Sequence, residues 1–242
     1  MQMKITIIGC GGVGTHLALP LLKYAETWFH NKYGNYHNNK LIFTLVDGDN
    51  FEEKNLERQL INPSGLGVNK ARWLGGFCNL FAKRTTEIKI VEEYITDENI
   101  KDILDGYVFS CVDNNATRKL IEEYRKNRHD NNYDTRFLNI ISGGNEVYDG
   151  NVYISNNQKI SISEIHKEIN DPQDVNPGES CTQLADTTPQ ISVANNMVAS
   201  LMLVQFYKMT DRDIVDDDKT ELYFDIRSGE VVGFDRRKRN GN

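Results

Sequence analysis

The feature that most constrains this chain is a glycine-rich turn, GCGGVG at residues 9–14, which joins two apolar segments. Residues 4–8 are rich in isoleucine and predict a buried strand, and residues 15–29 carry apolar side chains at helical spacing. Glycines allow a sharp turn and let phosphate oxygens approach the N–H groups at a helix start. This order predicts a nucleotide-binding βαβ unit, and the alternative is a glycine-rich turn without a ligand. The expected contacts are Gly9, Gly11, Gly12 and Gly14.

Apolar runs and helical patterns alternate through the first half of the chain and predict a parallel sheet. We expect further strands at residues 41–46, 87–94, 107–112 and 136–142, and helices at residues 69–79, 99–104, 116–127 and 189–208. A polar loop is expected at residues 30–40. Hairpins that turn at residues 149–150 and 227–230 predict an antiparallel extension. The predicted fold class is α/β, with a Rossmann-like, mostly parallel sheet, an antiparallel extension and helices on both faces.

Composition excludes several classes of protein. The net charge of −7 disfavours a nucleic-acid partner, which usually needs a basic face. No apolar run reaches the roughly 18–20 residues of a membrane span, and the start does not resemble a signal peptide, so we expect a cytoplasmic protein. The cysteines lie far apart and form no C-x-x-C pair, which argues against a zinc ribbon or a disulfide framework. They are Cys10, Cys78, Cys111 and Cys181.

A second group of polar residues follows the second predicted strand. An acid at its end, here Asp47, binds ribose hydroxyls in such folds, and this alone leaves NAD, FAD and ATP possible. Asn55, Arg58 and Gln59 lie within one or two turns of each other, and an arginine can bridge phosphate oxygens. Lys70 comes at a helix start, where its ammonium can reach the same phosphates.

The third strong strand ends at Asp113 and Asn114. Ligands of open α/β sheets bind outside the carboxyl ends of the strands, so these residues belong to the same site. A carboxylate beside a triphosphate favours Mg²⁺, which takes a few protein oxygens together with phosphates and water. The whole pattern favours ATP over a nicotinamide dinucleotide.

These motifs together resemble the ThiF/MoeB/HesA family, which is related to ubiquitin-activating enzymes. The matching motifs are G-x-G-G-x-G at residues 9–14, D-x-D at Asp47 and Asp49, N-L-x-R-Q at residues 55–59, Lys70, and D-N-x-x-x-R at residues 113–118. They follow the family's order and cover roughly the first half of the chain directly. Together they are highly specific, although single members are not.

The resemblance implies a function. Members of this family use Mg-ATP to adenylate the C-terminal Gly-Gly carboxylate of a ubiquitin-like or sulfur-carrier protein. It implies that Asp47 binds the ribose, that Asn55, Arg58 and Lys70 hold the phosphates, and that Asp113 positions Mg²⁺. Gln59 would support Arg58. The resemblance also implies a homodimer and one adenylation domain over residues 1–242, with a nucleotide-binding half at 1–145 and hairpins, crossover loop and C-terminal helix at 146–242.

Cys181 lies in a polar segment ahead of the last long helix. The resemblance implies a thioester-forming or sulfur-transfer cysteine at this place, on the crossover loop at residues 155–180 or just after it. A thiolate is the reactive form, and a polar site near a helix start favours it. The alternative is an ordinary loop cysteine in a protein that stops at the adenylate.

The sequence departs from the family pattern in two ways. Many relatives bind structural zinc through two C-x-x-C pairs near this loop, and none is present here, so we expect no structural zinc. Many relatives also carry, before the first strand, a helix whose arginine reaches the partner subunit's ATP site, whereas this sequence starts at the strand. The early start and the loop at residues 30–40 resemble the ThiF-like member of plasmid-type, ParB-related and ThiF-related cassettes.

Other functions remain open from the sequence. An NAD(P)-dependent oxidoreductase would explain the glycine turn and Asp47, but not Arg58, Lys70 and Asp113. A non-catalytic family member would bind only a nucleotide or a ubiquitin-like partner. A tRNA-modifying relative is disfavoured by the acidic charge. Two residues have structural alternatives, because Asp49 could only cap a turn and Arg118 could pair with a surface acid such as Glu122.

Overall fold

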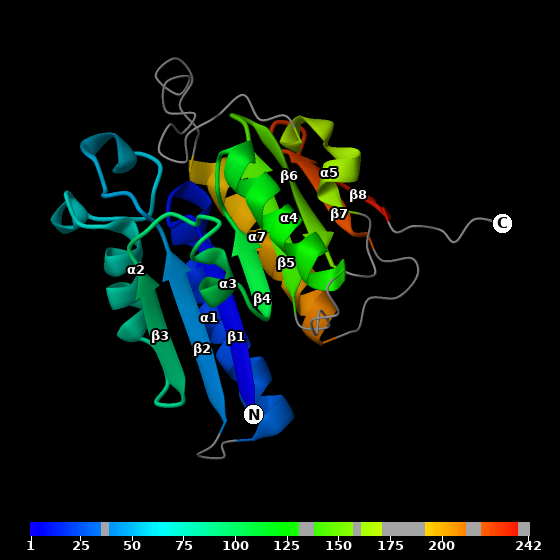
Figure 1. The fold of residues 1–242 in the computed structure, drawn as a ribbon. Coiled ribbons are helices and arrows are strands. Elements are labelled where there is room, and N and C mark those ends of the chain that lie inside the picture. Colours follow the sequence, from blue (N-terminus) through cyan, green and yellow to red (C-terminus); the bar gives the residue numbers. More distant parts are fainter. Residues whose placement is uncertain (35–38, 131–137, 157–160, 171–191, 212–218, 237–242) are drawn as a thin grey trace.

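Eight strands form one mixed sheet. The strands are β1 (Gln2–Ile8), β2 (Lys40–Val46), β3 (Thr86–Val91), β4 (Tyr107–Ser110), β5 (Asn139–Asn145), β6 (Asp149–Ser155), β7 (Glu221–Asp225) and β8 (Glu230–Phe234). Their order across the sheet is β3-β2-β1-β4-β5-β6-β7-β8 (Figure 1). The computed structural model describes residues 1–34, 39–130, 138–156, 161–170, 192–211 and 219–236.

The sheet changes from parallel to antiparallel at β5. Strands β3, β2, β1, β4 and β5 run parallel, and β5 to β8 pair as antiparallel neighbours. In β2 every residue from Leu41 to Val46 is buried, as expected for a parallel strand covered on both faces. The prediction of a mostly parallel sheet with an antiparallel extension is confirmed.

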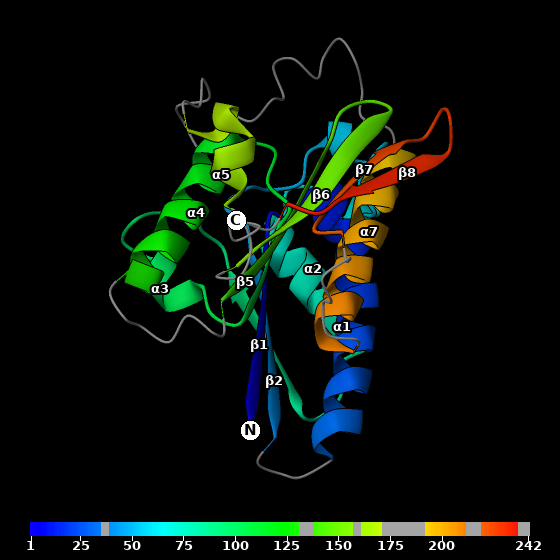
Figure 2. The same ribbon diagram turned by 90° about the vertical axis from the view of Figure 1, so that its right-hand side faces the viewer.

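Helices cover both faces of the sheet, as predicted (Figure 2). Helices α1 (Gly12–Tyr33), α2 (Lys70–Asn79) and α7 (Ser192–Thr210) lie on one face. Helices α3 (Ile100–Ile103), α4 (Asn115–Asp130) and α5 (Ile162–Ile165) lie on the other. Three short 3-10 turns complete the described elements, namely η1 (Glu53–Asn55), η2 (Pro63–Gly65) and η4 (Lys167–Ile169). Among the described residues, no helix is both long and apolar enough to cross a bilayer.

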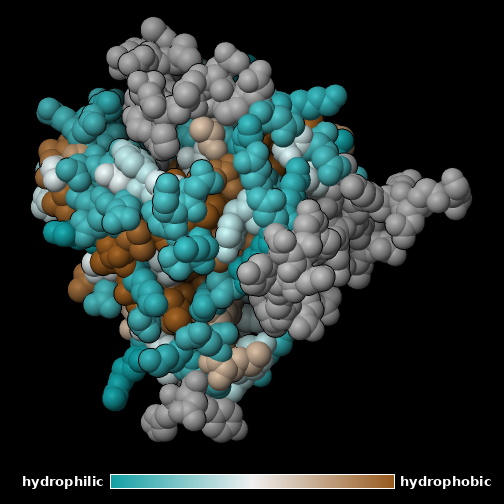
Figure 3. Space-filling view, viewed as in Figure 1, coloured by the Kyte–Doolittle hydropathy of each residue, from teal (hydrophilic) through white to brown (hydrophobic). Residues whose placement is uncertain are grey.

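Each face of the sheet has its own hydrophobic core. The larger core joins the sheet to α1, α2 and α7, where Phe206 packs edge-on against Phe109 and Tyr24. The smaller core lies beneath α3 and α4 around Val108 and Ile121. Partly buried apolar residues pack against it, and hydrophobic atoms show toward the middle of this face among hydrophilic side chains (Figure 3). The two cores pack the sheet between two layers of helices, so the carboxyl ends of the parallel strands have a fixed position relative to the helices.

Two local predictions were wrong. The expected loop at residues 30–40 begins later, because α1 continues to Tyr33. The first hairpin turns at residues 146–148, and the Asp149–Gly150 pair lies inside β6. Gly150 pairs with Asn145 of β5 and with Phe224 of β7, and a Cβ there would lie 2.4 Å from the Gly144 oxygen. This glycine permits a close approach between strands and does not form the turn.

The remaining segments agree with the sequence only in part where the structure describes them. The second hairpin turns between Asp225 and Glu230, as expected. The expected crossover loop at residues 155–180 contains α5 and η4, and residues 157–160 and 171–180 lie outside the described residues. Helix α7 begins at Ser192, the first described residue of the helix expected at 189–208.

A pair of helical glycines tests the packing of the glycine turn. A Cβ at Gly14 would lie 2.1 Å from the backbone oxygen of Gly9, whereas a Cβ at Gly76 of α2 would meet nothing within 4 Å. We expect Gly14→Ala to lower the free energy of unfolding by about 2 kcal/mol through overpacking. Gly76→Ala should raise it by about 0.5–1 kcal/mol, because alanine favours a helix interior. Urea denaturation of both variants measures this, and equal effects would contradict the packing argument.

Candidate active site

The glycine turn is fixed between the ends of three strands. Gly9 has a φ of +89° and donates its N–H to the Val46 oxygen of β2 at 2.9 Å. A Cβ on Gly9 would lie 2.8 Å from the Cys111 oxygen, which follows β4. The chain then enters α1 at Gly12. The backbone N–H groups of a helix start therefore face the edge of the sheet, where they can bind an anion.

The Asp47 carboxylate ties this turn to β2. One oxygen accepts the Cys10 N–H at 2.6 Å and the other accepts the Asp49 N–H at 2.9 Å. Burial raises the pKa of Asp47, while the Lys70 charge and these backbone bonds oppose the rise. The Asp47 side chain thus holds the backbone of the glycine turn and the backbone that follows β2 in place. Its position at the end of β2 also predicts the ribose contact.

Lys70 lies among carboxylates. Its Nζ donates to Asp49 Oδ2 at 2.9 Å, and its side chain is only 12% exposed. Burial alone would lower the pKa of Lys70, but the charge of Asp47 and the bond to Asp49 raise it, with a further contribution from Asp113. The ammonium is therefore held charged at the site. Asp49 also accepts a hydrogen bond from the Tyr94 hydroxyl, so it does more than cap a turn.

The N-L-x-R-Q segment begins at the last residue of η1, and its three polar side chains have different surroundings. Asn55 is buried, and its Oδ1 accepts the Glu52 N–H at 2.8 Å in a capping box, so it supports the turn. Gln59 lies beside Gly11, and its Oε1 is buried without a hydrogen-bond partner among the described residues. Arg58 lines the cavity. The described side chains form no Gln59–Arg58 hydrogen bond, so the predicted support of Arg58 stays a prediction.

The D-N motif follows β4. Asn114 is buried, and its Oδ1 accepts the Thr117 N–H at 2.8 Å, which caps the start of α4. Asp113 lines the same cavity as Lys70 and interacts with it electrostatically. Among the described residues, no group of three or more His, Cys, Asp or Glu side chains could hold a metal ion. Mg²⁺ does not require one, because it keeps waters and phosphates and takes one or two carboxylates.

Most of these residues line one cavity of about 690 Å³. The predicted site residues that line it are Gly9, Gly11, Gly12, Asp47, Asp49, Asn55, Arg58, Gln59, Lys70, Asp113 and Asn114. Gly14 does not line it, since it packs against Gly9 behind the turn. Cys181 lies outside the described residues.

Asn195 of α7 is a cavity residue that the sequence motifs did not indicate. Its side chain is fully buried, packs against Gly12, and donates from Nδ2 to the Arg58 oxygen at 3.1 Å. Its Oδ1 is buried without a hydrogen-bond partner among the described residues. Asn195 thus connects α7 to the glycine turn and to the residue Arg58, which lies 137 positions earlier in the sequence. A contact over this separation leaves no local sequence motif.

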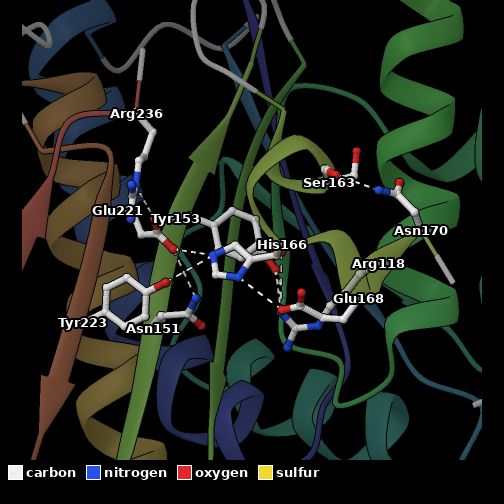
Figure 4. A network of polar contacts seen from close by, with 11 residues as sticks. Arg118, Asn151, Tyr153, Ser163, His166, Glu168, Asn170, Glu221, Tyr223 and Arg236 are labelled. Carbon is white, nitrogen blue, oxygen red and sulfur yellow. Dashed lines mark hydrogen bonds and ion pairs between the residues drawn. The ribbon is translucent and has the colours of Figure 1, made fainter. Parts of the chain in front are cut away.

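The far end of the cavity carries a second polar cluster (Figure 4). His166 Nε2 lies 2.6 Å from Glu221 Oε1, and His166 Nδ1 lies 3.2 Å from Glu168 Oε1. Arg236 Nε donates to Glu221 Oε2 at 2.8 Å. The hydrogen bond of Glu221 raises the pKa of His166 against the effect of burial. Burial alone would raise the pKa of Glu221, but bonds from His166, Tyr223 and Arg236 lower it to about 2.

Arg118 also contributes to this end of the cavity. It does not pair with Glu122, which instead binds Arg125 at 2.8 Å. Arg118 donates from Nη2 to the Val112 oxygen at 2.8 Å and to the Gly143 oxygen at 3.1 Å. The alternative of a surface ion pair is therefore wrong, because the side chain turns toward the sheet.

Comparisons with known proteins agree with this architecture. The ThiF family model matches residues 1–240. No curated protein matches the chain. Among solved structures, it is similar to E. coli MccB solved with ATP, with a TM-score of 0.67 and 15% identity over 98% of this chain and 65% of MccB. PaaA gives a TM-score of 0.62 and 18% identity over 98% of this chain and 65% of PaaA. The chain thus spans slightly under two thirds of these proteins, and at such identities the likeness concerns the fold.

The His166–Glu221 pair makes a pH-dependent contribution to stability. The pKa of His166 is raised from 6.5, so its contribution is complete below that pH and is lost as pH rises through the folded-state value. The pKa of Glu221 falls from 4.5 to about 2, so its contribution is present above pH 4.5 and is lost in acid. We expect His166→Asn to destabilise by about 2 kcal/mol between these limits and by much less at alkaline pH.

Chemical denaturation across pH measures this difference. His30→Asn is the matched control, because burial lowers the pKa of His30 and the sign of its pH dependence is opposite. A cost of His166→Asn that does not change with pH would contradict the assignment.

Proposed function

The chain belongs to the ThiF family, and we propose that it is an ATP-dependent adenylyltransferase that activates a carboxylate of a peptide or protein substrate. The observation that carries the proposal is the convergence of the glycine turn, Lys70, Arg58 and Asp113 on one cavity. MccB, to which the fold is similar, was solved with ATP and with MccA. We propose that residues 1–242 form one adenylation unit, because side chains from both halves of the sequence line the cavity.

The reaction fits the charges of the site. A substrate carboxylate oxygen forms a bond to the α-phosphorus of ATP, and the bond from that phosphorus to the bridging oxygen breaks, so that pyrophosphate leaves with the electron pair. Charge gathers on phosphoryl oxygens, and fixed cations in a partly buried site stabilise it. Lys70 is such a cation, since its carboxylate neighbours keep it protonated. Arg58 supplies a planar donor for the phosphates.

Other residues have supporting roles in this proposal. Asp47 binds the ribose while it holds the turn, and Asn55 and Gln59 shape the phosphate side of the cavity. Asp113 would hold Mg²⁺, which supplies a charge that neutralises the phosphates. The donor set fits this ion, since one carboxylate beside a triphosphate suffices.

We propose that the partner is a ubiquitin-like or sulfur-carrier protein that ends in Gly-Gly and that the chain forms a homodimer, as the resemblance to the family implies. A subsequent thioester or sulfur transfer through Cys181 stays a prediction. The carboxyl group of an acyl-adenylate is activated. Attack by a thiolate on its carbonyl carbon forms a thioester and releases AMP.

ATP binding tests the phosphate assignment. Lys70→Gln should raise the dissociation constant of ATP about tenfold or more, because a charge-assisted bond is lost and the Asp49 carboxylate loses its ion-pair partner. Isothermal titration calorimetry measures this. Lys4→Gln is the matched control, since Lys4 pairs with Asp105 and does not line the cavity. Binding of NADH without binding of ATP would overturn the proposal in favour of an oxidoreductase.

Catalysis is tested separately from binding with Asp113→Ala. We expect this variant to lose about 100-fold or more of the exchange between ATP and labelled pyrophosphate, measured with peptides that end in Gly-Gly. Removal of Mg²⁺ with a chelator should have a similar effect. Circular dichroism checks the fold of the variant. Wild-type protein that binds ATP but exchanges no pyrophosphate with these peptides would favour a non-catalytic binding protein.

A further inference from the structure

Arg118 of α4 is a cation whose acceptors are all neutral. In addition to the two backbone oxygens bound by Nη2, Nη1 donates to Ser142 Oγ at 3.3 Å and to the Tyr153 hydroxyl at 3.5 Å. In the part of the chain that the structure describes, no carboxylate lies within ion-pair distance of this guanidinium. It nevertheless lines the cavity together with Lys70 and the glycine turn.

The sheet is built to accommodate this side chain. A Cβ on Gly144 would lie 2.6 Å from Arg118 Nη2, so glycine at this position leaves room for the guanidinium. The short bonds of Nη2 to backbone oxygens fix its orientation. The bonds of Nη1 are long, and a stronger acceptor would displace them readily. Nη1 is therefore the edge at which a ligand oxygen would most readily replace a neutral acceptor.

The carboxylates of the cluster in Figure 4 do not form ion pairs with Arg118. The two carboxylates of the cluster in Figure 4, Glu221 and Glu168, are matched by His166 and Arg236. A partly buried cation without a counter-ion costs free energy unless a ligand supplies the opposite charge. A guanidinium of this kind in a cavity is suited to bind an anionic ligand.

Two anionic reactants must meet in the proposed reaction, and the cavity has two cationic ends. The glycine turn, Arg58 and Lys70 lie at the end where β1 and β2 finish. Arg118 lies against β5 and β6, on the other side of β4. A guanidinium matches the planar geometry of a carboxylate in a paired, two-bond arrangement.

We propose that the Arg118 end of the cavity is the subsite for the substrate's terminal carboxylate, which Arg118 Nη1 binds and orients. This rests on the proposed adenylation and adds the group that recognises the second substrate. Arg118 is thus a specificity-determining residue, because a chain that ends in an amide offers it no charge.

Glu168 acts as an internal competitor in this arrangement. Its side chain is 64% exposed, lines the cavity, and binds His166 Nδ1. The incoming carboxylate meets the repulsion of this charge and competes for the His166 imidazolium. Removal of the Glu168 charge should therefore tighten carboxylate binding, whereas removal of the Arg118 charge should weaken it.

The probes are glycylglycine and glycylglycinamide, which differ in the terminal charge. Titration with either, in the presence of a non-hydrolysable ATP analogue, is followed by NMR of the isotope-labelled full chain. We expect glycylglycine to bind in the millimolar range and the amide about tenfold more weakly or not at all. Arg118→Gln should weaken glycylglycine binding about tenfold, with Arg118→Lys intermediate, and Glu168→Gln should tighten it about threefold.

Arg128→Gln is the matched control, since Arg128 lies on the same helix, pairs with Asp105 and does not line the cavity. It should bind glycylglycine as the wild type does. The amide comparison needs no variant, so it holds even if Arg118→Gln fails to fold.

The outcomes separate this proposal from the one it rests on. Wild-type protein that does not bind ATP overturns the proposed function itself. Wild-type protein that binds ATP but binds both dipeptides equally, or binds neither up to about 50 mM, overturns the carboxylate subsite alone. Unchanged glycylglycine binding in folded Arg118→Gln overturns it as well.

Discussion

The site depends on the parallel register of three strands. Ile8, the last residue of β1, pairs with Val46 of β2 and with Ser110 of β4, so all three strands end side by side. Hydrogen bonds that continue past these ends bring the Gly9 turn and the residues after β4 to one edge. Side chains far apart in sequence therefore share one cavity because their strands stop at the same level. A shift of one residue in this register would move every flanking strand residue to the opposite face.

Ion pairs and hydrogen bonds then hold the charged side chains of the cavity in place. Two cations of the cavity are held in different ways: Lys70 by Asp49 at one end, and Arg118 by backbone and hydroxyl oxygens at the other. The first arrangement keeps an ammonium charged despite burial. The second keeps a guanidinium in place without neutralising it. The proposed reaction brings two anions together, and it would benefit from both arrangements, since each cation is fixed before the ligand arrives.

The sequence predicted the elements whose signals are local. The turn at residues 9–14 and the strand at residues 41–46 follow from glycine spacing and an unbroken apolar run, and both are confirmed. The first hairpin turn was misplaced because an Asp-Gly pair normally signals a turn, whereas Gly150 is required by close neighbours in two adjoining strands. The same limit applies to Arg118, whose acceptors come from elements that only the folded sheet brings near.

The sequence by itself determined the fold class, the glycine turn and the residues that line the Lys70 end of the cavity, because each lies in a motif a few residues long beside a strand or helix signal. Only the tertiary structure decided the second end of the cavity. His166 and Glu221 are 55 residues apart, and Asn195 reaches the glycine turn from α7. Such contacts arise from the antiparallel extension and the packing of helices. Sequence periodicity indicates the face on which a side chain lies, but not which distant residue it contacts.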